Sequence, residues 1–222
     1  MDERPVFVGP ARVERVRSAL AGRLGSVVVV AECVRRRHNA SAILRSAEAF
    51  GIHEVHLITR GFRVSKGAAR GAERWILRRR FDTVDESLVE LRERDFRVVV
   101  ADVRPGAVPP EEVPVDRPVA LVLGSEAFGP SDAARAFADF SLMIPMRGLT
   151  ESLNVSVSGA IAMRVLAERR RALVGADLAP EEQARFLADW LAAEEEAVRG
   201  FHARTAATPL RPPPGGHDGD IP

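Results

Sequence analysis

The chain has little of what disulfide-bonded, zinc-binding and membrane proteins require. Its 222 residues include one cysteine, Cys33, which excludes an internal disulfide and leaves no Cys/His spacing typical of a zinc site. No apolar run approaches the ~20 residues that a membrane-spanning helix needs. The N-terminus also lacks the basic and then apolar segments of a secretory signal. We therefore expect a cytoplasmic protein with no bound metal and no membrane partner.

Lysine is nearly absent as well, and arginine takes its place. Lys66 is the only lysine among 32 basic residues, which 31 acidic residues nearly balance. A GC-rich genome would account for this usage, whereas phosphate binding would favour the planar guanidinium fork. Arginine clusters stand at 35–37, 78–80 and 169–171. Local basic clusters in a nearly neutral chain are typical of a protein that binds nucleic acid on one face, although each cluster could also be a solvated charge run.

The apolar pattern predicts a parallel α/β sheet. Segments 27–31, 97–101 and 119–123 are continuously apolar, as in strands buried on both faces. They alternate with helical patterns, which predicts a mostly parallel sheet with helices on both faces. Further strands are expected at 54–59, 75–77 and 141–144, and helices at 10–23, 39–50, 85–94, 131–138, 154–171 and 180–198.

Composition along the chain predicts its domain organisation. We expect an N-terminal helical extension at 1–25, an α/β domain at 26–172 and a C-terminal helical extension at 173–209. Residues 61–73 are expected to form a loop and 104–118, with five prolines, a connector. The tail at 210–222 is rich in proline and glycine, which predicts disorder.

Three segments are expected to meet at one edge of this sheet, because ligands of parallel sheets lie beyond the carboxyl ends of the strands. The first begins at Asn39, a plausible helix N-cap with Gly51 as the stop. The second, Gly124-Ser-Glu-Ala-Phe-Gly129, follows a buried strand directly. It matches neither a Rossmann nor a Walker fingerprint, which argues against a triphosphate ligand. Glu126, at its centre, is a candidate functional carboxylate or else a surface one.

The third segment is the stretch 144–161, in which an apolar strand, a short loop and a helix follow one another. Polar residues in the first and third segments have two interpretations each. Arg45 follows Asn39 among apolar residues that look buried, so it needs an acidic or phosphate partner. That partner could be a ligand, or Glu48 or Glu126 in a structural salt bridge. Ser152 and Asn154 open the helix at 154–171 and are either simple caps or groups that help to bind a polar ligand.

Together these segments resemble the SpoU/TrmH family of RNA 2′-O-ribose methyltransferases, within the SPOUT class. The first family motif is similar to Asn39-Ala-Ser-Ala-Ile-Leu-Arg45-Ser-Ala-Glu-Ala-Phe-Gly51, and the second to Leu121-Val-Leu-Gly-Ser-Glu-Ala-Phe-Gly129. The third is similar to Ile144-Pro-Met-Arg-Gly-Leu-Thr-Glu-Ser-Leu-Asn-Val-Ser-Val157. The motifs occur in family order, and the resemblance runs from about residue 27 to residue 171.

The resemblance implies features that the pattern alone does not. It implies a C-terminal trefoil knot, a rare exception to the usual rules of chain connection. It also implies S-adenosylmethionine as cofactor and a homodimer with the active site near the interface, and a narrower match within the family implies tRNA as the partner. Within the family, the terminal extensions and Arg117-Pro118 look most like the branch that methylates guanosine 18 of tRNA.

The resemblance also assigns roles to residues. Arg45 matches the catalytic arginine, and the supporting residues would be Asn39, Glu126, Ser152 and Asn154. Asn39 and Glu126 would hold Arg45, which we expect to anchor a phosphate rather than to act as a base, because arginine stays protonated. The cofactor pocket would use Asp102, Gly124, Ile144, Met146 and Leu153. The family often has threonine at the position of Asp102.

Substrate RNA is expected to meet the basic ends of the chain, at Arg12, Arg15, Arg17, Arg169, Arg170 and Arg171. Two other substrates within the same enzyme class remain open, namely 23S rRNA and the wobble ribose of tRNA. A third possibility, from a different class, is a non-catalytic RNA-binding module on the same fold.

Overall fold

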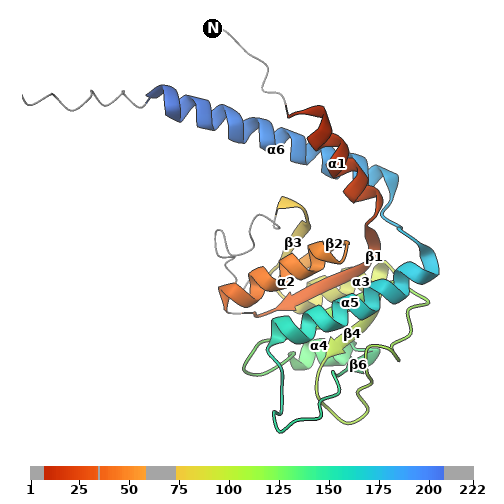
Figure 1. Cartoon of the computed structure of the whole chain (residues 1–222). Coiled ribbons are helices and arrows are strands. Elements are labelled where there is room, and N and C mark those ends of the chain that lie inside the picture. The colour runs from red at the N-terminus through yellow and green to blue at the C-terminus, as the bar shows by residue number, and fades with distance from the viewer. Residues whose placement is uncertain (1–7, 35, 59–73, 208–222) are drawn as a thin grey trace, which may run out of the picture.

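The computed structural model describes residues 8–34, 36–58 and 74–207. Its centre is a six-stranded sheet in the order β3-β2-β1-β5-β4-β6, and every pair of neighbouring strands is parallel (Figure 1). The strands are β1 (Leu24–Glu32), β2 (Ile52–Ile58), β3 (Leu77–Phe81), β4 (Arg97–Ala101), β5 (Val119–Leu123) and β6 (Phe140–Leu142). The helices are α1 (Pro10–Ala21), α2 (Arg37–Ala49), α3 (Val84–Glu93), α4 (Asp132–Phe137), α5 (Val155–Val174) and α6 (Pro180–Ala207). The expected loop at 61–73 and the tail at 210–222 lie outside the described residues.

Helices cover both faces of the sheet, which confirms the predicted α/β architecture. Along β1, Val27 and Val29 point into a core that α2 and α5 complete, while Val28 and Val30 point into a second core with α3 and α4. Alternate residues of each central strand are therefore buried on opposite faces. This double burial explains why these strands are apolar throughout.

The strand order places a ligand crevice between β1 and β5. From β1 the chain moves outward to β2 and β3, and it returns to build β4, β5 and β6 on the other side. The carboxyl ends of β1 and β5 thus mark the point where the strand order reverses, and connections leave it in opposite directions. Ligands of open parallel sheets bind at such points.

Several element boundaries differ from the sequence-based prediction. Helix α2 begins two residues early, so Asn39 is not its N-cap but a buried residue of its first turn. Strand β3 spans 77–81 rather than 75–77, because an exposed edge strand tolerates its arginines. Strand β6 ends at Leu142, which leaves Ile144 in the following loop. Helix α6 continues to Ala207 rather than ending near residue 198.

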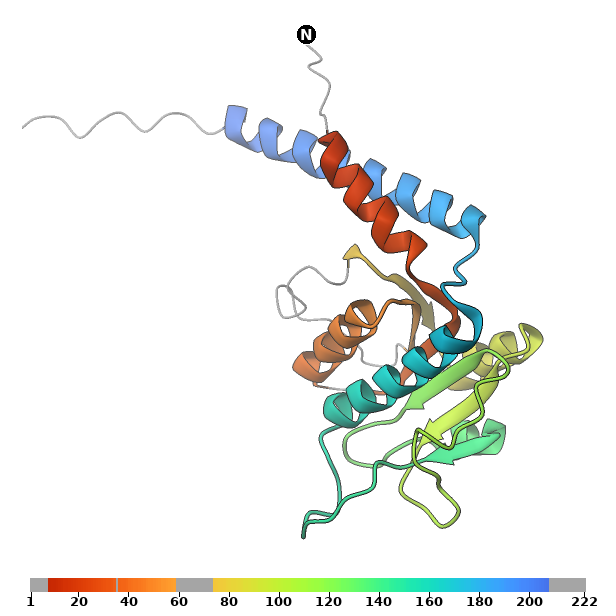
Figure 2. The ribbon, with the colours of Figure 1, turned by 45° about the vertical axis from the view of Figure 1, so that its right-hand side comes forward.

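Helices α1 and α6 lie side by side at one end of the molecule (Figure 2). Their contact is a small core of its own, formed by Val16, Leu20, Leu178 and Trp190. Trp75 also packs on Trp190, with 5.2 Å between ring centroids. Within the described ranges, we find no helix whose length and hydropathy would let it cross a lipid bilayer.

Candidate active site

A pocket of about 550 Å³ opens at the carboxyl ends of the central strands. Its volume is within the range of small-molecule sites. Four stretches of chain form most of its wall, at 101–103, 124–130, 142–146 and 152–158, and Arg36 completes it. All five residues assigned to the cofactor from the family resemblance line it, namely Asp102, Gly124, Ile144, Met146 and Leu153.

The loop at 124–130 folds back on itself to form one wall. Ser125 and Gly129 exchange two backbone hydrogen bonds of 2.9 and 3.0 Å, and Gly129 has a φ of 66°. A Cβ at Gly124 would lie 2.1 Å from the backbone of Gly129 and Pro130. Only glycine therefore fits at position 124, because the missing Cβ leaves room for the backbone of Gly129 and Pro130.

The three predicted segments meet through side-chain hydrogen bonds. Nδ2 of Asn39, on α2, donates to Oε1 of Glu126 at 2.8 Å. Nδ2 of Asn154 donates in turn to Oδ1 of Asn39 at 3.1 Å. Asn154 also caps α5 by accepting the Ser156 N–H at 2.8 Å. The prediction that these segments converge at one edge of the sheet is confirmed.

Two supporting residues differ from their predicted local roles. Asn39 is almost fully buried, and it orients Glu126 and Asn154 rather than Arg45. The expectation that Asn39 and Glu126 hold Arg45 is therefore wrong. Ser152 lines the pocket from the exposed loop before α5, where it caps no helix.

Arg45 is exposed rather than buried, which corrects the expectation drawn from its apolar neighbours. The buried stripe of α2 runs through Ala40, Ile43, Leu44 and Ala47, and Arg45 falls outside it. Neither predicted carboxylate partner is engaged with it: Glu48 pairs with Arg23, and Glu126 accepts from Asn39. In the part of the chain that the structure describes, Arg45 forms no ion pair.

The side chain of Asp102 makes a contact that the sequence did not reveal. Its Oδ2 accepts a hydrogen bond from Nε of Arg135, on α4, at 2.8 Å. This bond is the largest cause that raises the pKa of Arg135. The Asp102 N–H donates to the Leu142 carbonyl at 2.9 Å, which ties the end of β4 to β6. The carboxylate is thus neutralised at the pocket wall.

Most of the arginines predicted to bind RNA form hydrogen bonds or ion pairs within the protein. Arg170 is buried and donates to Ser26 and to the Val115 and Asp116 carbonyls, while Arg169 and Arg171 also donate to backbone carbonyls. This cluster binds the protein's own backbone, contrary to the prediction of a surface for RNA. Arg12 pairs with Glu194 and Arg17 with Glu14. Arg15 is exposed and, among the described residues, unpaired.

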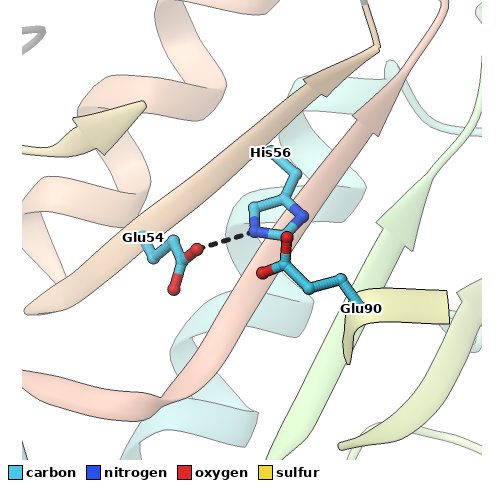
Figure 3. A group of neighbouring side chains, drawn as sticks. All are labelled: Glu54, His56 and Glu90. Atoms are coloured by element: carbon cyan, nitrogen blue, oxygen red, sulfur yellow. Dashed lines mark hydrogen bonds and ion pairs between the residues drawn. The ribbon is translucent and has the colours of Figure 1, made fainter. Parts of the chain in front are cut away.

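A second polar cluster lies under the edge of the sheet. One ligand atom each from Glu54, His56 and Glu90 lie within 4.8 Å of one another (Figure 3). Arg94 donates to Glu54 at 2.8 Å, and Arg79 pairs with Glu90, so arginines already supply the positive charge that a cation would bring. Burial by itself would raise the pKa of Glu54, but hydrogen bonds from His56 and Arg94 lower it to about 2. The cluster is therefore a self-compensated structural network.

Residues 26–164 match the SpoU rRNA Methylase family. The chain belongs to this family. A tRNA (guanosine(18)-2′-O)-methyltransferase of Thermus thermophilus is 36% identical over 187 residues, covering 82% of this chain and 96% of that protein. The enzyme of the same name from Escherichia coli is 34% identical over 170 residues, covering 76% of this chain and 74% of that protein.

Solved structures agree with this assignment. The crystal structure of the A. aeolicus TrmH/SpoU tRNA modifying enzyme superposes with a TM-score of 0.74 at 30% identity, covering 81% of this chain and 94% of that one. The SpoU methyltransferase AviRb from Streptomyces viridochromogenes, in complex with AdoMet, gives 0.60 at 22% identity, covering 68% and 62%, which shows the shared fold alone. The chain is thus a methyltransferase of the SpoU family.

Proposed function

We propose that this SpoU-family enzyme transfers the methyl group of S-adenosylmethionine to the ribose 2′-hydroxyl of guanosine 18 in tRNA. The observation that carries the proposal is the Asn39–Glu126–Asn154 network at the pocket, in a chain of which 82% matches a relative of that name. A cytoplasmic location follows from a tRNA substrate.

The pocket suits this cofactor in its chemistry. Ile144, Met146 and Leu153 offer apolar surface to a nucleoside, and Gly124 allows the tight fold of the loop at 124–130 that forms one wall of the pocket. Arg135 neutralises Asp102, so the backbone of Asp102 rather than its carboxylate is available to the cofactor. When bound, the cofactor supplies an electrophilic methyl group.

The protein contributes to the reaction mainly by positioning the ribose hydroxyl relative to the methyl group. The ribose hydroxyl is a weak nucleophile that must be aligned with the methyl group and must lose a proton. Free arginine has a pKa above ~12, so Arg45 is costly as a base. Arg45 instead anchors a substrate phosphate, a role that its exposed and unpaired state in the described structure allows. Orientation supplies much of the rate, and the proton passes to an oxygen at the pocket wall, where Glu126 and Ser152 lie.

A homodimer with the active site near its interface is part of the proposal. Val157 and Ile161 are 47% and 38% exposed and lie four residues apart on α5, and Leu153, 38% exposed, lies in the loop just before that helix at the pocket wall. The helical spacing puts Val157 and Ile161 on one face of α5, and this exposed apolar stripe suits contact with a second copy. Helix α2, which carries Arg45, packs beside α5, so the interface would lie close to both.

The trefoil knot also belongs to the proposal, together with terminal extensions at 1–25 and 173–209 around a domain at 26–172. The loops at 124–130 and 143–154 are separate in sequence and line one pocket. This proximity is what a knotted crossing would require, and the family resemblance supplies the threading itself, which a crystal structure that traces the chain through both loops tests.

Methyl transfer from labelled S-adenosylmethionine to bulk tRNA and, separately, to rRNA tests the proposed function. Mapping of the product by nuclease digestion and mass spectrometry should place the label on the ribose of guanosine 18. Label in 23S rRNA or at the wobble ribose would instead support the other substrates. Failure to bind S-adenosylmethionine in calorimetry would support a non-catalytic RNA-binding module.

A further inference from the structure

Exposed arginines of this chain differ in whether a carboxylate faces them. Many are paired: Arg17 with Glu14, Arg164 with Glu168, and Arg185 with Glu182 are examples. By contrast, several exposed arginines form neither an ion pair nor a side-chain hydrogen bond within the described ranges, namely Arg15, Arg36, Arg37, Arg45, Arg78, Arg80 and Arg147. Five of these seven belong to α2 with its N-cap or to β3.

Strand β3 presents its arginines to two different faces. Arg79 turns toward α3, where it pairs with Glu90. Arg78 and Arg80 alternate with it and are exposed, so they lie on the other face, about 6.6 Å apart along the strand. Their partners in the parallel register with β2 are Val55 and Leu57.

That other face is the one that α2 covers. Val55 and Leu57 belong to the same core as Ile43 and Leu44 of α2. Arg78 and Arg80 therefore emerge from the sheet beside α2, the helix that carries Arg45. The sheet edge and the helix make one basic flank on this side of the molecule.

The flank begins at the pocket. In the parallel register, Glu32 at the end of β1 is level with Ile58, and Ile58 is level with Phe81 at the end of β3. Two strand spacings amount to about 10 Å, which is the lateral step from the end of β1 to that of β3. Arg36, which lines the pocket, and Arg37 follow the end of β1 within a few residues.

Arg37 lies at the N-terminus of α2, where the helix dipole is unfavourable to a positive charge. It is the first residue of α2, and no acidic residue of the helix itself lies in that first turn. The partial positive charge of a helix N-terminus makes a cation there less favourable, and the carboxylate of Glu126 at this terminus accepts hydrogen bonds from the Arg36 N–H and from Asn39. The exposed Arg37 guanidinium forms no ion pair among the described residues, so it is available to a phosphate.

From these observations we infer that Arg37, Arg78 and Arg80 form a phosphate track, which holds the backbone of the RNA substrate as it leaves the pocket along the α2–β3 flank. The inference rests on the proposed function for the identity of the RNA. It replaces the expected surface at residues 169–171, whose guanidinium groups bind carbonyls of the protein itself. Arginine suits the role because its fork binds phosphate bidentately.

Binding of an unmodified tRNA transcript to the full-length chain over a series of salt concentrations tests the track. Removal of one phosphate-binding side chain lowers the slope of log K against log salt by about 0.7–0.9. The double variant Arg78→Gln/Arg80→Gln should therefore have a slope that is smaller by between one and two units, with a raised KM for tRNA and an unchanged kcat. Arg78→Lys/Arg80→Lys should keep most of the slope, because the charge remains.

Two controls separate the track from general charge and from misfolding. Arg117→Gln removes one positive charge beside the amino end of β5, at the opposite end of the sheet from the pocket, and should leave the slope unchanged. Affinity for S-adenosylmethionine should be unchanged in every variant.

A slope equal to that of the wild type in the double Gln variant would overturn the inference. The same result with new self-association would mean that the arginines only protect a sheet edge from pairing. If the wild-type chain binds tRNA and the slope falls in the variants as expected, but no methyl group is transferred, the track stands and the proposed function fails.

Discussion

At the scale of single residues, Asn39 and Arg45 divide the work of one helix. Asn39 is buried and joins Glu126 to Asn154, whereas Arg45 stands in solvent on the same helix. The first residue fixes the geometry of the pocket wall, and the second is left to meet a substrate that carries charge. We therefore expect a change at Asn39 to disturb the pocket and a change at Arg45 to disturb contact with the substrate.

For Arg45→Lys we expect turnover to fall by about 10²-fold, because an ammonium group keeps the charge but loses the bidentate fork that orients a phosphate. Affinity for S-adenosylmethionine should stay at the wild-type value, since Arg45 does not line the pocket. Arg164→Lys, on an exposed arginine of α5, is the matched control. Single-turnover kinetics with tRNA measures the effect, and near-wild-type turnover would exclude any role for the fork.

His53 predicts how stability depends on pH. Burial is the largest cause that lowers the pKa of His53 to about 4, and the charge of Arg23 adds to it. The unfolded chain binds the proton near pH 6.5 and the folded chain only near pH 4. Folding stability should therefore fall as pH drops from 6.5 to 4, by about 3 kcal/mol in total.

Urea unfolding at pH 7 and pH 4.5 measures this dependence. In His53→Phe the ring contact with Phe186 can remain, and most of the difference in stability between the two pH values should disappear. His38→Gln, at an exposed histidine, should behave like the wild type. Equal pH dependence in wild type and His53→Phe would show that His53 titrates normally in the folded state.

Sequence patterns located some of these residues and misjudged others, for physical reasons. Asn39, Glu126 and Asn154 were found because they stand in short motifs that follow the carboxyl ends of strands, where a parallel sheet brings such segments together. The ion pair between Asp102 and Arg135 joins positions 33 residues apart, and no local pattern marks it. The run at 169–171 could not be distinguished from a surface cluster, because its carbonyl partners are set only by tertiary packing.

At the scale of elements, the loop at 124–130 depends on one absent side chain. A Cβ at Gly124 would overlap backbone atoms of Gly129 and Pro130, which cannot move aside as a flexible side chain can. Gly124→Ala should therefore distort the pocket wall and abolish binding of S-adenosylmethionine in calorimetry. Gly148→Ala, whose Cβ would meet only one side-chain atom at 3.9 Å, should bind as the wild type does. Retained binding in Gly124→Ala would contradict the close packing within this loop.

The packing of helix α1 against helix α6 depends on Trp190. Its side chain is 4% exposed in the small core between them. Trp190→Ala should remove about 3–5 kcal/mol of stability from this contact. Amide hydrogen exchange should show α1 and α6 losing protection while β1 and β5 keep theirs. Trp190→Phe, which keeps most of the ring, should lose much less, and uniform loss of protection across the sheet would contradict a separate core.

Prediction at the scale of elements succeeded where burial dictates sequence. The central strands are buried on both faces, so their composition alone identified them. Strand β3 was misplaced because an edge strand is exposed, and its three arginines do not look like a strand. The start of α2 was misplaced because its N-cap, Arg36, makes no side-chain cap bond, and so leaves no capping signature.

At the scale of the whole molecule, the apolar stripe of α5 predicts association. Val157→Asp puts a charge in that stripe, so the chain should become monomeric in light scattering and lose turnover. Val89→Asp makes the same change on the exposed face of α3, across the sheet, and should leave both unchanged. A wild-type chain that is already monomeric and active would contradict the dimer.

The central claim is that the pocket methylates the ribose of one guanosine in tRNA. The most direct test compares two tRNA molecules that are identical except that one carries 2′-deoxyguanosine at position 18, the position that the names of the relatives specify. With labelled S-adenosylmethionine, we expect one methyl group per molecule of the ribose form and none in the deoxy form. Equal incorporation into both would place the methyl group elsewhere and contradict methylation of this ribose.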